Sequence, residues 1–163
     1  TEEKWVYVYD YIKIYLYDPT VNFFYSINDL AKDGTPELIL GVQDKGEYIP
    51  FIIYAYDGKK AKWLCIREEY IMKIYEGGII EYITGGVRTH FFYEKIEKDS
   101  ITTLRLADIV MDIQDENKFH YYKEVEKEKY EEISEEEFIK IRNQYTKDEI
   151  DIEWVRLEGF WEK

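Results

Sequence analysis

Three acidic side chains in one short loop are the residues whose types and spacing best suit a chemical role. Asp29, Asp33 and Glu37 stand at positions 1, 5 and 9 of this loop, and Gly34 stands at position 6. Calcium binds several oxygen ligands from a loop that curls around the ion, and a glycine permits the sharp turn. With the main-chain carbonyl of Thr35 as a further ligand, the spacing predicts a calcium site.

The loop departs from the helix–loop–helix calcium motif at two places. Ala31, at position 3, has no side-chain oxygen, and Leu40 stands at position 12, where that motif has a bidentate glutamate. The apolar run 38–40 is typical of a strand, which predicts a strand–loop–strand arrangement. The alternative is a metal-free turn, in which Asp29 accepts main-chain N–H groups and Glu37 caps the loop. The sequence leaves both alternatives open.

Residues 24–40 resemble the D-x-[DN]-x-D-G-x-x-E-L loops of FG-GAP and VCBS-like repeats. More closely, they are similar to a group of secreted proteins and lipoproteins of Gram-positive, often gut, bacteria. In that group an N-terminal helix precedes the loop, a Y-x-Y-D-G-K hairpin follows it (here 54–59), and a late helix begins as I-S-E-E-E-F (here 133–138). The resemblance places Asp29, Asp33 and Glu37 at metal-binding positions. It implies an extracellular or cell-surface protein, lipoproteins included, and no particular activity.

The other groups with chemical potential are scattered along the chain. His90 and His120 are the two histidines, and as a pair in space they would form a zinc site or a general base, but neither has a His or Cys at ligand spacing. Cys65, the single cysteine, lies in an apolar run, which predicts an inert buried thiol. The 35 acidic residues guarantee chance carboxylate pairs. We therefore expect no catalytic residues and no enzyme activity.

Aromatic residues give a clearer indication of binding. They make up 18% of the chain, including 17 tyrosines and 4 tryptophans. Tyr and Trp on a sheet face can stack on sugar rings or anchor a partner protein. A domain of this size cannot bury all of its tyrosines in this part of the chain, which are Tyr70, Tyr75, Tyr82, Tyr93, Tyr121 and Tyr122. Either some of these form an aromatic platform for a ligand, or they are the ordinary surface tyrosines of a β protein.

The charge of the chain narrows the choice of partners. The formal net charge is −13, from 35 acidic and 22 basic residues. Such a surface repels phosphate backbones and anionic membranes, so we expect no nucleic-acid partner. No apolar run approaches the about 20 residues that span a bilayer. Because the chain begins at Thr1, we expect that an upstream segment has been removed, which leaves room for a secretory signal within it.

These groups must be positioned by a small number of elements. Apolar spacing predicts a helix over residues 2–17, which Asp18-Pro19 ends. Turn signals then separate about seven or eight short strands. Ser134 and Glu137 form a capping box that begins a late helix, and the alternation over 150–154 predicts a closing strand. The sequence thus predicts a single α+β domain over 1–163, with an N-terminal helix, an antiparallel β-meander and one late helix packed on the sheet.

Three functional hypotheses follow. The first is a non-enzymatic extracellular or cell-surface bacterial domain that binds a protein or glycan, with calcium as an optional brace. The second is an intracellular acidic inhibitor or immunity-type protein that neutralises a basic partner. The third, a hydrolase that uses carboxylates, requires a concave pocket with two carboxyl groups at catalytic separation. The first agrees best with the aromatic content and the loop.

Overall fold

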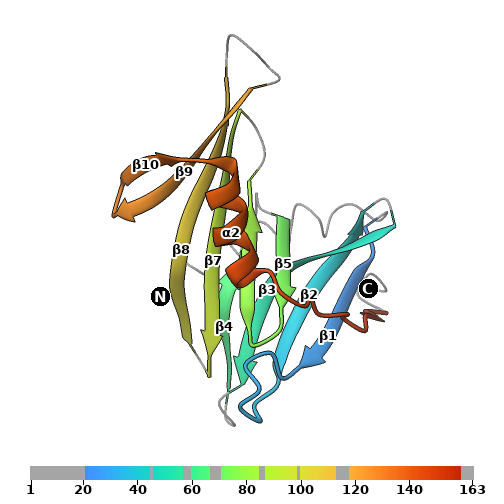
Figure 1. The fold of residues 1–163 in the computed structure, drawn as a ribbon. Helices are drawn as coiled ribbons and strands as arrows, with labels where there is room; N and C mark the ends of the chain where they lie inside the picture. Colours follow the sequence, from blue (N-terminus) through green and yellow to red (C-terminus); the bar gives the residue numbers. More distant parts are fainter. Residues whose placement is uncertain are drawn as a thin grey trace.

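The computed structural model describes residues 21–44, 46–56, 60–66, 71–84, 87–98, 100–112 and 118–158. The helix predicted over 2–17 and its end at Asp18-Pro19 lie outside these residues. The described chain consists mostly of strands, which form two antiparallel sheets with one helix beside them (Figure 1).

The first sheet has five strands in the order β11-β1-β2-β3-β4. Their bounds are β1 (Phe23–Asn28), β2 (Glu37–Asp44), β3 (Glu47–Tyr56), β4 (Ala61–Ile66) and β11 (Val155–Arg156). The hairpin between β2 and β3 turns at Gly46, whose φ of 91° suits a residue without a Cβ. The predicted hairpin of β3 and β4 is confirmed by their antiparallel pairing.

The second sheet has six strands in the order β10-β9-β8-β7-β6-β5. Their bounds are β5 (Ile71–Tyr75), β6 (Ile79–Ile83), β7 (Arg88–Glu97), β8 (Ser100–Met111), β9 (Phe119–Glu126) and β10 (Lys129–Ile133). Each strand pairs with its neighbour in the chain, as in a meander. The turn between β5 and β6 has positive φ at Gly77 and Gly78.

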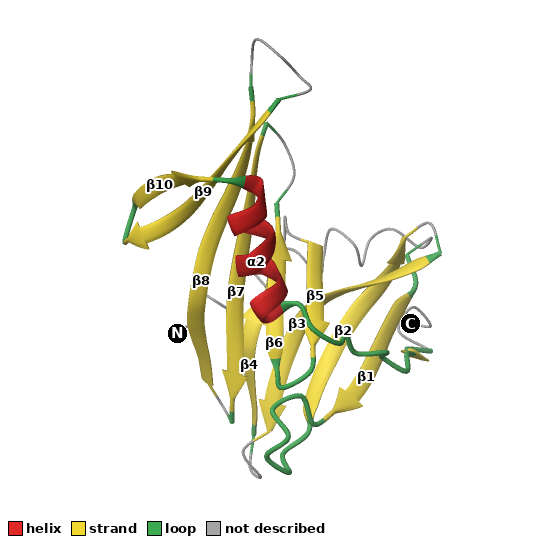
Figure 2. Ribbon diagram, in the orientation of Figure 1, coloured by secondary structure: helices red, strands yellow, loops and turns green. Residues whose placement is uncertain are grey.

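The helix α2 (Glu135–Tyr145) begins where the sequence predicts. The Ser134 hydroxyl accepts the main-chain N–H of Glu137 at 3.1 Å, which satisfies one free donor of the first turn. Phe138 and Ile141 are buried on the inner face. The centroids of the Phe138 and Phe91 rings lie 5.3 Å apart, and α2 packs on the face of the six-stranded sheet (Figure 2).

The molecule therefore has three layers, and β6 shows how they are separated. Ile80 and Tyr82 point into the core between the two sheets, whereas Glu81 between them contacts the helix. Buried residues from both sheets and from the acidic loop form that inner core: Leu30, Ile39, Ile53, Cys65, Met72, Ile74, Ile80, Tyr82 and Ile96. A second cluster, around Phe91 and Phe138, lies beneath the helix on the outer face.

The predicted α+β class with a single meander is wrong, because the described chain is a mostly β structure with 11 strands in two sheets. Turn chemistry marks where strands end but carries no information on which sheet the next strand joins. β4 ends at Ile66 and β5 begins at Ile71, yet they belong to different sheets.

The predicted closing strand over 150–154 is also wrong. Only Val155 and Arg156 form a strand, which pairs with β1. The alternation has another cause: Ile150, Ile152 and Trp154 pack against the inner core, while Asp151 and Glu153 are exposed. An extended chain gives the same period of two as a strand, and this one pairs with β5 only at its start, through the bridge of Glu149 with Tyr75 and the Ile150 N–H that donates to the Ile74 carbonyl.

Candidate functional site

The acidic loop connects β1 and β2 and closes on itself through hydrogen bonds. The two carboxylate oxygens of Asp29 accept the main-chain N–H groups of Asp33 at 3.0 Å and Gly34 at 2.9 Å. Oδ1 of Asp33 accepts the N–H of Thr35 at 2.8 Å. Asp29 and Asp33 are exposed, whereas the side chain of Leu30 is buried in the inner core and anchors the loop there.

Glu37 lies fully buried beneath this loop, with 0% of its surface exposed. Its Oε2 accepts the N–H of Leu30 at 2.8 Å, while Oε1 is buried without a hydrogen-bond partner. Burial raises the pKa of the Glu37 carboxyl, and the charges of Asp33 and Asp29 act in the same direction. A buried carboxylate oxygen without a hydrogen-bond donor destabilises the folded state, unless the carboxyl is protonated or a cation lies next to the oxygen.

The structure thus brings the four predicted ligands, Asp29, Asp33, Thr35 and Glu37, into one turn. The unpartnered Oε1 of Glu37 is the observation that fits a cation there. The other carboxylates already accept main-chain donors, as the metal-free alternative predicts. Among the described residues, no three His, Cys, Asp or Glu side chains are arranged as a metal site. Calcium binding stays a prediction.

The two histidines bind different carboxylates. Nδ1 of His90 lies 2.7 Å from Oδ1 of the fully buried Asp108, whose Oδ2 accepts Nε of Arg88 at 2.9 Å. An aspartate that orients an imidazole through Nδ1 is part of many general-base arrangements. Here Arg88 shares that aspartate, and its guanidinium lies 4.9 Å from the centre of the Tyr130 ring. The cluster ties β7, β8 and β10 together.

His120 has its own pair of acidic neighbours on the projecting strands. Its Nδ1 lies 2.8 Å from Glu132, and its Nε2 lies 3.4 Å from Asp112. Hydrogen bonds to Glu132 and then to Asp112 raise the pKa of His120. The predicted inert character of Cys65 agrees with its burial in the inner core.

Three of the six tyrosines singled out in the sequence are buried and so take no part in an aromatic platform. Tyr75 is 4% exposed, and Tyr82 and Tyr93 are 0% exposed. Tyr121 is partly buried against the cluster beneath α2, and Tyr70 lies outside the described residues. Tyr75 and Tyr93 can be buried because the hydroxyl of each donates a hydrogen bond to Glu81.

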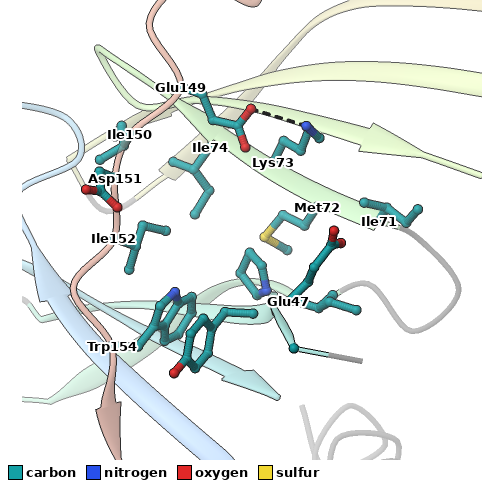
Figure 3. Close-up of a pocket in the computed structure, with 14 residues that line it drawn as sticks. Glu47, Ile71, Met72, Lys73, Ile74, Glu149, Ile150, Asp151, Ile152 and Trp154 are labelled. Carbon is teal, nitrogen blue, oxygen red and sulfur yellow. Dashed lines mark hydrogen bonds and ion pairs between the residues drawn. The ribbon is translucent and has the colours of Figure 1, made fainter. Parts of the chain in front are cut away.

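A groove of about 590 Å³ lies where the two sheets meet beside the extended segment 149–154 (Figure 3). Pockets of about 300–1,000 Å³ are typical of ligand sites. Three stretches far apart in the chain line this groove: residues 46–50 at the start of β3, residues 71–74 of β5, and residues 149–152 with Trp154. We name it the β3–β5 groove.

One wall of the β3–β5 groove is an aromatic pair. The Tyr48 and Trp154 rings stack with centroids 5.8 Å apart and an interplanar angle of 14°. Tyr48 is 43% exposed, and its ring also makes a T-shaped contact with the Phe24 ring, with centroids 4.8 Å apart. The hydroxyl of Ser26 holds the wall in place by donating to the carbonyl of Glu153 at 2.7 Å.

The β3–β5 groove combines an aliphatic lining with an acidic rim. Lys73 donates to Glu149 at 3.2 Å, so its charge is paired within the groove (Figure 3). Glu47 and Asp151 are exposed acidic residues among those that line it. Its aliphatic surface comes from Ile71, which is 54% exposed, and from the half-buried Ile150 and Ile152, whereas Met72 and Ile74 beneath them are only 2% exposed. The groove can therefore bury apolar groups and attract cationic ones.

Sequence reasoning missed this groove because no local pattern joins its three stretches. The signal that could have indicated it was the alternation over 150–154, which sets Ile150, Ile152 and Trp154 on one side. That pattern indicated an apolar face without identifying what it packs on.

No protein-family model matches the chain, and no curated protein or solved structure is significantly similar to it. Within the described residues, no helix combines the length and apolar character needed to cross a membrane.

Proposed function

We propose that this chain is a non-enzymatic, extracellular or cell-surface bacterial domain that binds a partner protein in the β3–β5 groove. The observation that supports this function is the groove itself, with its aliphatic lining and the stacked pair Tyr48–Trp154 at one wall. Tyr and Trp are common anchors of protein interfaces. A protein partner is preferred because the exposed Ile71 adds an apolar surface of the kind that protein interfaces cover. The extracellular setting rests on the resemblance of residues 24–40.

A photo-crosslinking amino acid tests where the partner binds. Ile71, at the groove, is 54% exposed, and Ile139, on the solvent side of α2, is 48% exposed, which makes position 139 a matched control. We expect p-benzoylphenylalanine at position 71, and not at position 139, to crosslink a partner in cells that carry the gene. The partner is then purified and titrated against wild type and Tyr48→Ala. Equal crosslinking at both positions, or equal affinity for both proteins, contradicts the proposal.

Calcium as a brace is the second part of the proposal. Asp29, Asp33, the carbonyl of Thr35 and Glu37 would hold the ion. The ion would take the place of the hydrogen-bond partner that Oε1 of Glu37 lacks. The loop is anchored in the inner core by Leu30 and bound to the β5–β6 turn by the ion pair of Lys32 with Glu76. A bound cation would therefore stabilise the fold and take no part in chemistry.

The alternative, an intracellular inhibitor of a basic partner, is favoured by the net charge of −13 alone. It differs in where the partner binds. If a general acidic surface binds the partner, charge reversal at the groove rim and at the β9–β10 hairpin should weaken binding equally. If the groove binds it, only charge reversal at the rim should weaken binding.

A further inference from the structure

We propose that His120 is a pH-dependent latch that, in its protonated form, joins the end of β8 to β10 across β9. The inference concerns the projecting hairpin of β9 and β10 and is separate from the β3–β5 groove. It stands on the geometry around one imidazole, because each of the two ring nitrogens lies against a carboxylate from a different neighbouring segment.

The two contacts of the ring require two protons. Nδ1 of His120 lies 2.8 Å from Oε1 of Glu132 on β10, and Nε2 lies 3.4 Å from Oδ2 of Asp112, one residue beyond the end of β8. An ionised carboxylate only accepts hydrogen bonds, and a neutral imidazole carries a single N–H. Both contacts are therefore hydrogen bonds only while His120 is an imidazolium. Loss of one proton leaves a nitrogen lone pair facing a carboxylate, so one of the two contacts is lost.

The strand that the latch holds has few other attachments. β10 is the last strand of its sheet and pairs with β9, and β9 pairs with β8 over residues 119–123, beyond which the hairpin projects from the sheet (Figure 1). The Asp112 N–H donates to the Lys118 carbonyl at 2.8 Å, which fixes Asp112 beside the start of β9. The guanidinium of Arg88 over the Tyr130 ring is a second side-chain link to β10, and neither group changes charge between pH of about 5 and 9.

The charges around His120 set the direction of the response. Among the described residues, Glu132, Asp112 and Lys118 are the charged groups that act on it, and the β8 residue opposite it is the apolar Val110. Hydrogen bonds to Glu132 and then to Asp112 raise the pKa of His120 in spite of the like charge of Lys118. The closed hairpin thus holds the proton more tightly than an opened one. Its contribution is complete below the ordinary pKa of about 6.5 and is lost as the pH rises through the raised pKa.

The chain has two histidines, so NMR can follow the imidazole of His120 directly. Long-range ¹H–¹⁵N spectra between pH of about 5 and 9 report the proton on each ring nitrogen, and the spectrum of His90→Gln assigns the His120 signals. We expect a proton on both nitrogens at the acidic end and a pKa above the ordinary value of about 6.5. Glu132→Gln and Asp112→Asn should each lower that pKa. A His120 pKa at or below the ordinary value, or one that neither variant lowers, overturns the inference.

Hydrogen exchange of the β10 amides measures the latch itself. After correction for the intrinsic exchange rate, their protection should fall as the pH rises through the measured pKa of His120. The fall should be about tenfold for each unit by which that pKa exceeds the ordinary value, since the same proton links both quantities. The amides of β6, which lies between β5 and β7, should keep their protection over this range. Protection of β10 that does not change with pH overturns the inference.

Glu131→Gln is the matched control, because it removes the same charge from the residue next to Glu132. Successive side chains of a strand point to opposite faces, and the Glu131 carboxylate lies 3.6 Å from Nζ of Lys123. We expect Glu131→Gln to keep the pH response of the β10 amides, whereas Glu132→Gln and His120→Gln should remove most of it. An equal loss in Glu131→Gln and Glu132→Gln would show that the general acidity of the hairpin sets the response, and would overturn the role of His120.

Discussion

Glu81 and Arg142 form a two-pronged ion pair across 61 residues of chain. Nε and Nη2 of Arg142 donate to Oε1 and Oε2 of Glu81 at 2.9 and 3.2 Å. The Tyr93 hydroxyl donates to Oε1 at 3.1 Å, and the Tyr75 hydroxyl donates to Oε2 at 3.0 Å. Each oxygen of this fully buried carboxylate therefore has two donors. The network fixes α2 on the outer face of the six-stranded sheet.

Removal of the guanidinium should loosen the helix. Arg142→Met keeps much of the side-chain volume but leaves Glu81 buried with two neutral donors. Breaking a buried pair costs about 3–5 kcal/mol, and we expect about 2–4 kcal/mol here, because water reaches the Arg142 side chain, which is 39% exposed. Urea unfolding measures the change, with exposed Lys140→Met on the same helix as the control. A loss no larger than that of the control would contradict this role for the ion pair.

The two tyrosines of the network should give the protein a distinct alkaline response. Burial, followed by the charge and hydrogen bond of Glu81, raises the pKa values of Tyr75 and Tyr93 above the ordinary value of about 10. The folded state then keeps protons that the unfolded chain releases. Their contribution to stability is thus complete below pH of about 10 and falls as the pH rises further, by about 1.4 kcal/mol per pH unit for each tyrosine.

Urea unfolding between neutral and alkaline pH tests this response. Stability should fall more steeply with pH in wild type than in the double variant Tyr75→Phe with Tyr93→Phe, which has no hydroxyl to ionise at either site. Ultraviolet absorbance should show that the two tyrosines ionise only as the chain unfolds. Parallel pH profiles of wild type and double variant would show that these hydroxyls ionise freely in the folded protein.

Local signals predicted local structure well, and α2 is the best example. Ser134, Glu137 and the spacing of Phe138 and Ile141 located its start and buried face, because capping and amphipathic period act within a few residues. The partner of the helix could not be predicted the same way. Glu81, a lone acidic residue between Ile80 and Tyr82, indicates only that some buried donor must exist.

Contacts between distant segments were beyond sequence patterns. The acidic loop was located because its candidate ligands lie within nine residues, whereas the β3–β5 groove required β3, β5 and the segment 149–154 to meet in space. The same limit explains the wrong fold class. Whether β5 continues the first sheet or begins a second one depends on packing of both sheets around residues such as Ile39 and Ile80.

Gly41 should control the position of the groove wall. A Cβ built at Gly41 would lie 2.6 Å from Cη2 of Trp154 and 3.0 Å from the Ile49 carbonyl, so Gly41→Ala must displace the indole. We expect a stability loss of about 1–3 kcal/mol and a shifted Trp154 resonance in ¹⁹F NMR of 5-fluorotryptophan-labelled protein. Gly46→Ala is the control: its φ of 91° disfavours alanine, but nothing lies near its Cβ. An unchanged Trp154 signal in Gly41→Ala would disprove the close approach.

Calcium should stabilise the wild type through the acidic loop. Weak extracellular sites have dissociation constants of about 1 mM. With such a constant, about 5 mM calcium adds about 1 kcal/mol to the free energy of unfolding relative to EDTA. Asp33→Asn is the decisive variant, since its amide oxygen can still accept the Thr35 N–H while the charge is lost. We expect it to match wild type in EDTA and to lose the calcium response, whereas Glu136→Gln, at the exposed start of α2, keeps it. A melting temperature of wild type that is the same in calcium and EDTA would leave Glu37 as the buried cap of a metal-free turn.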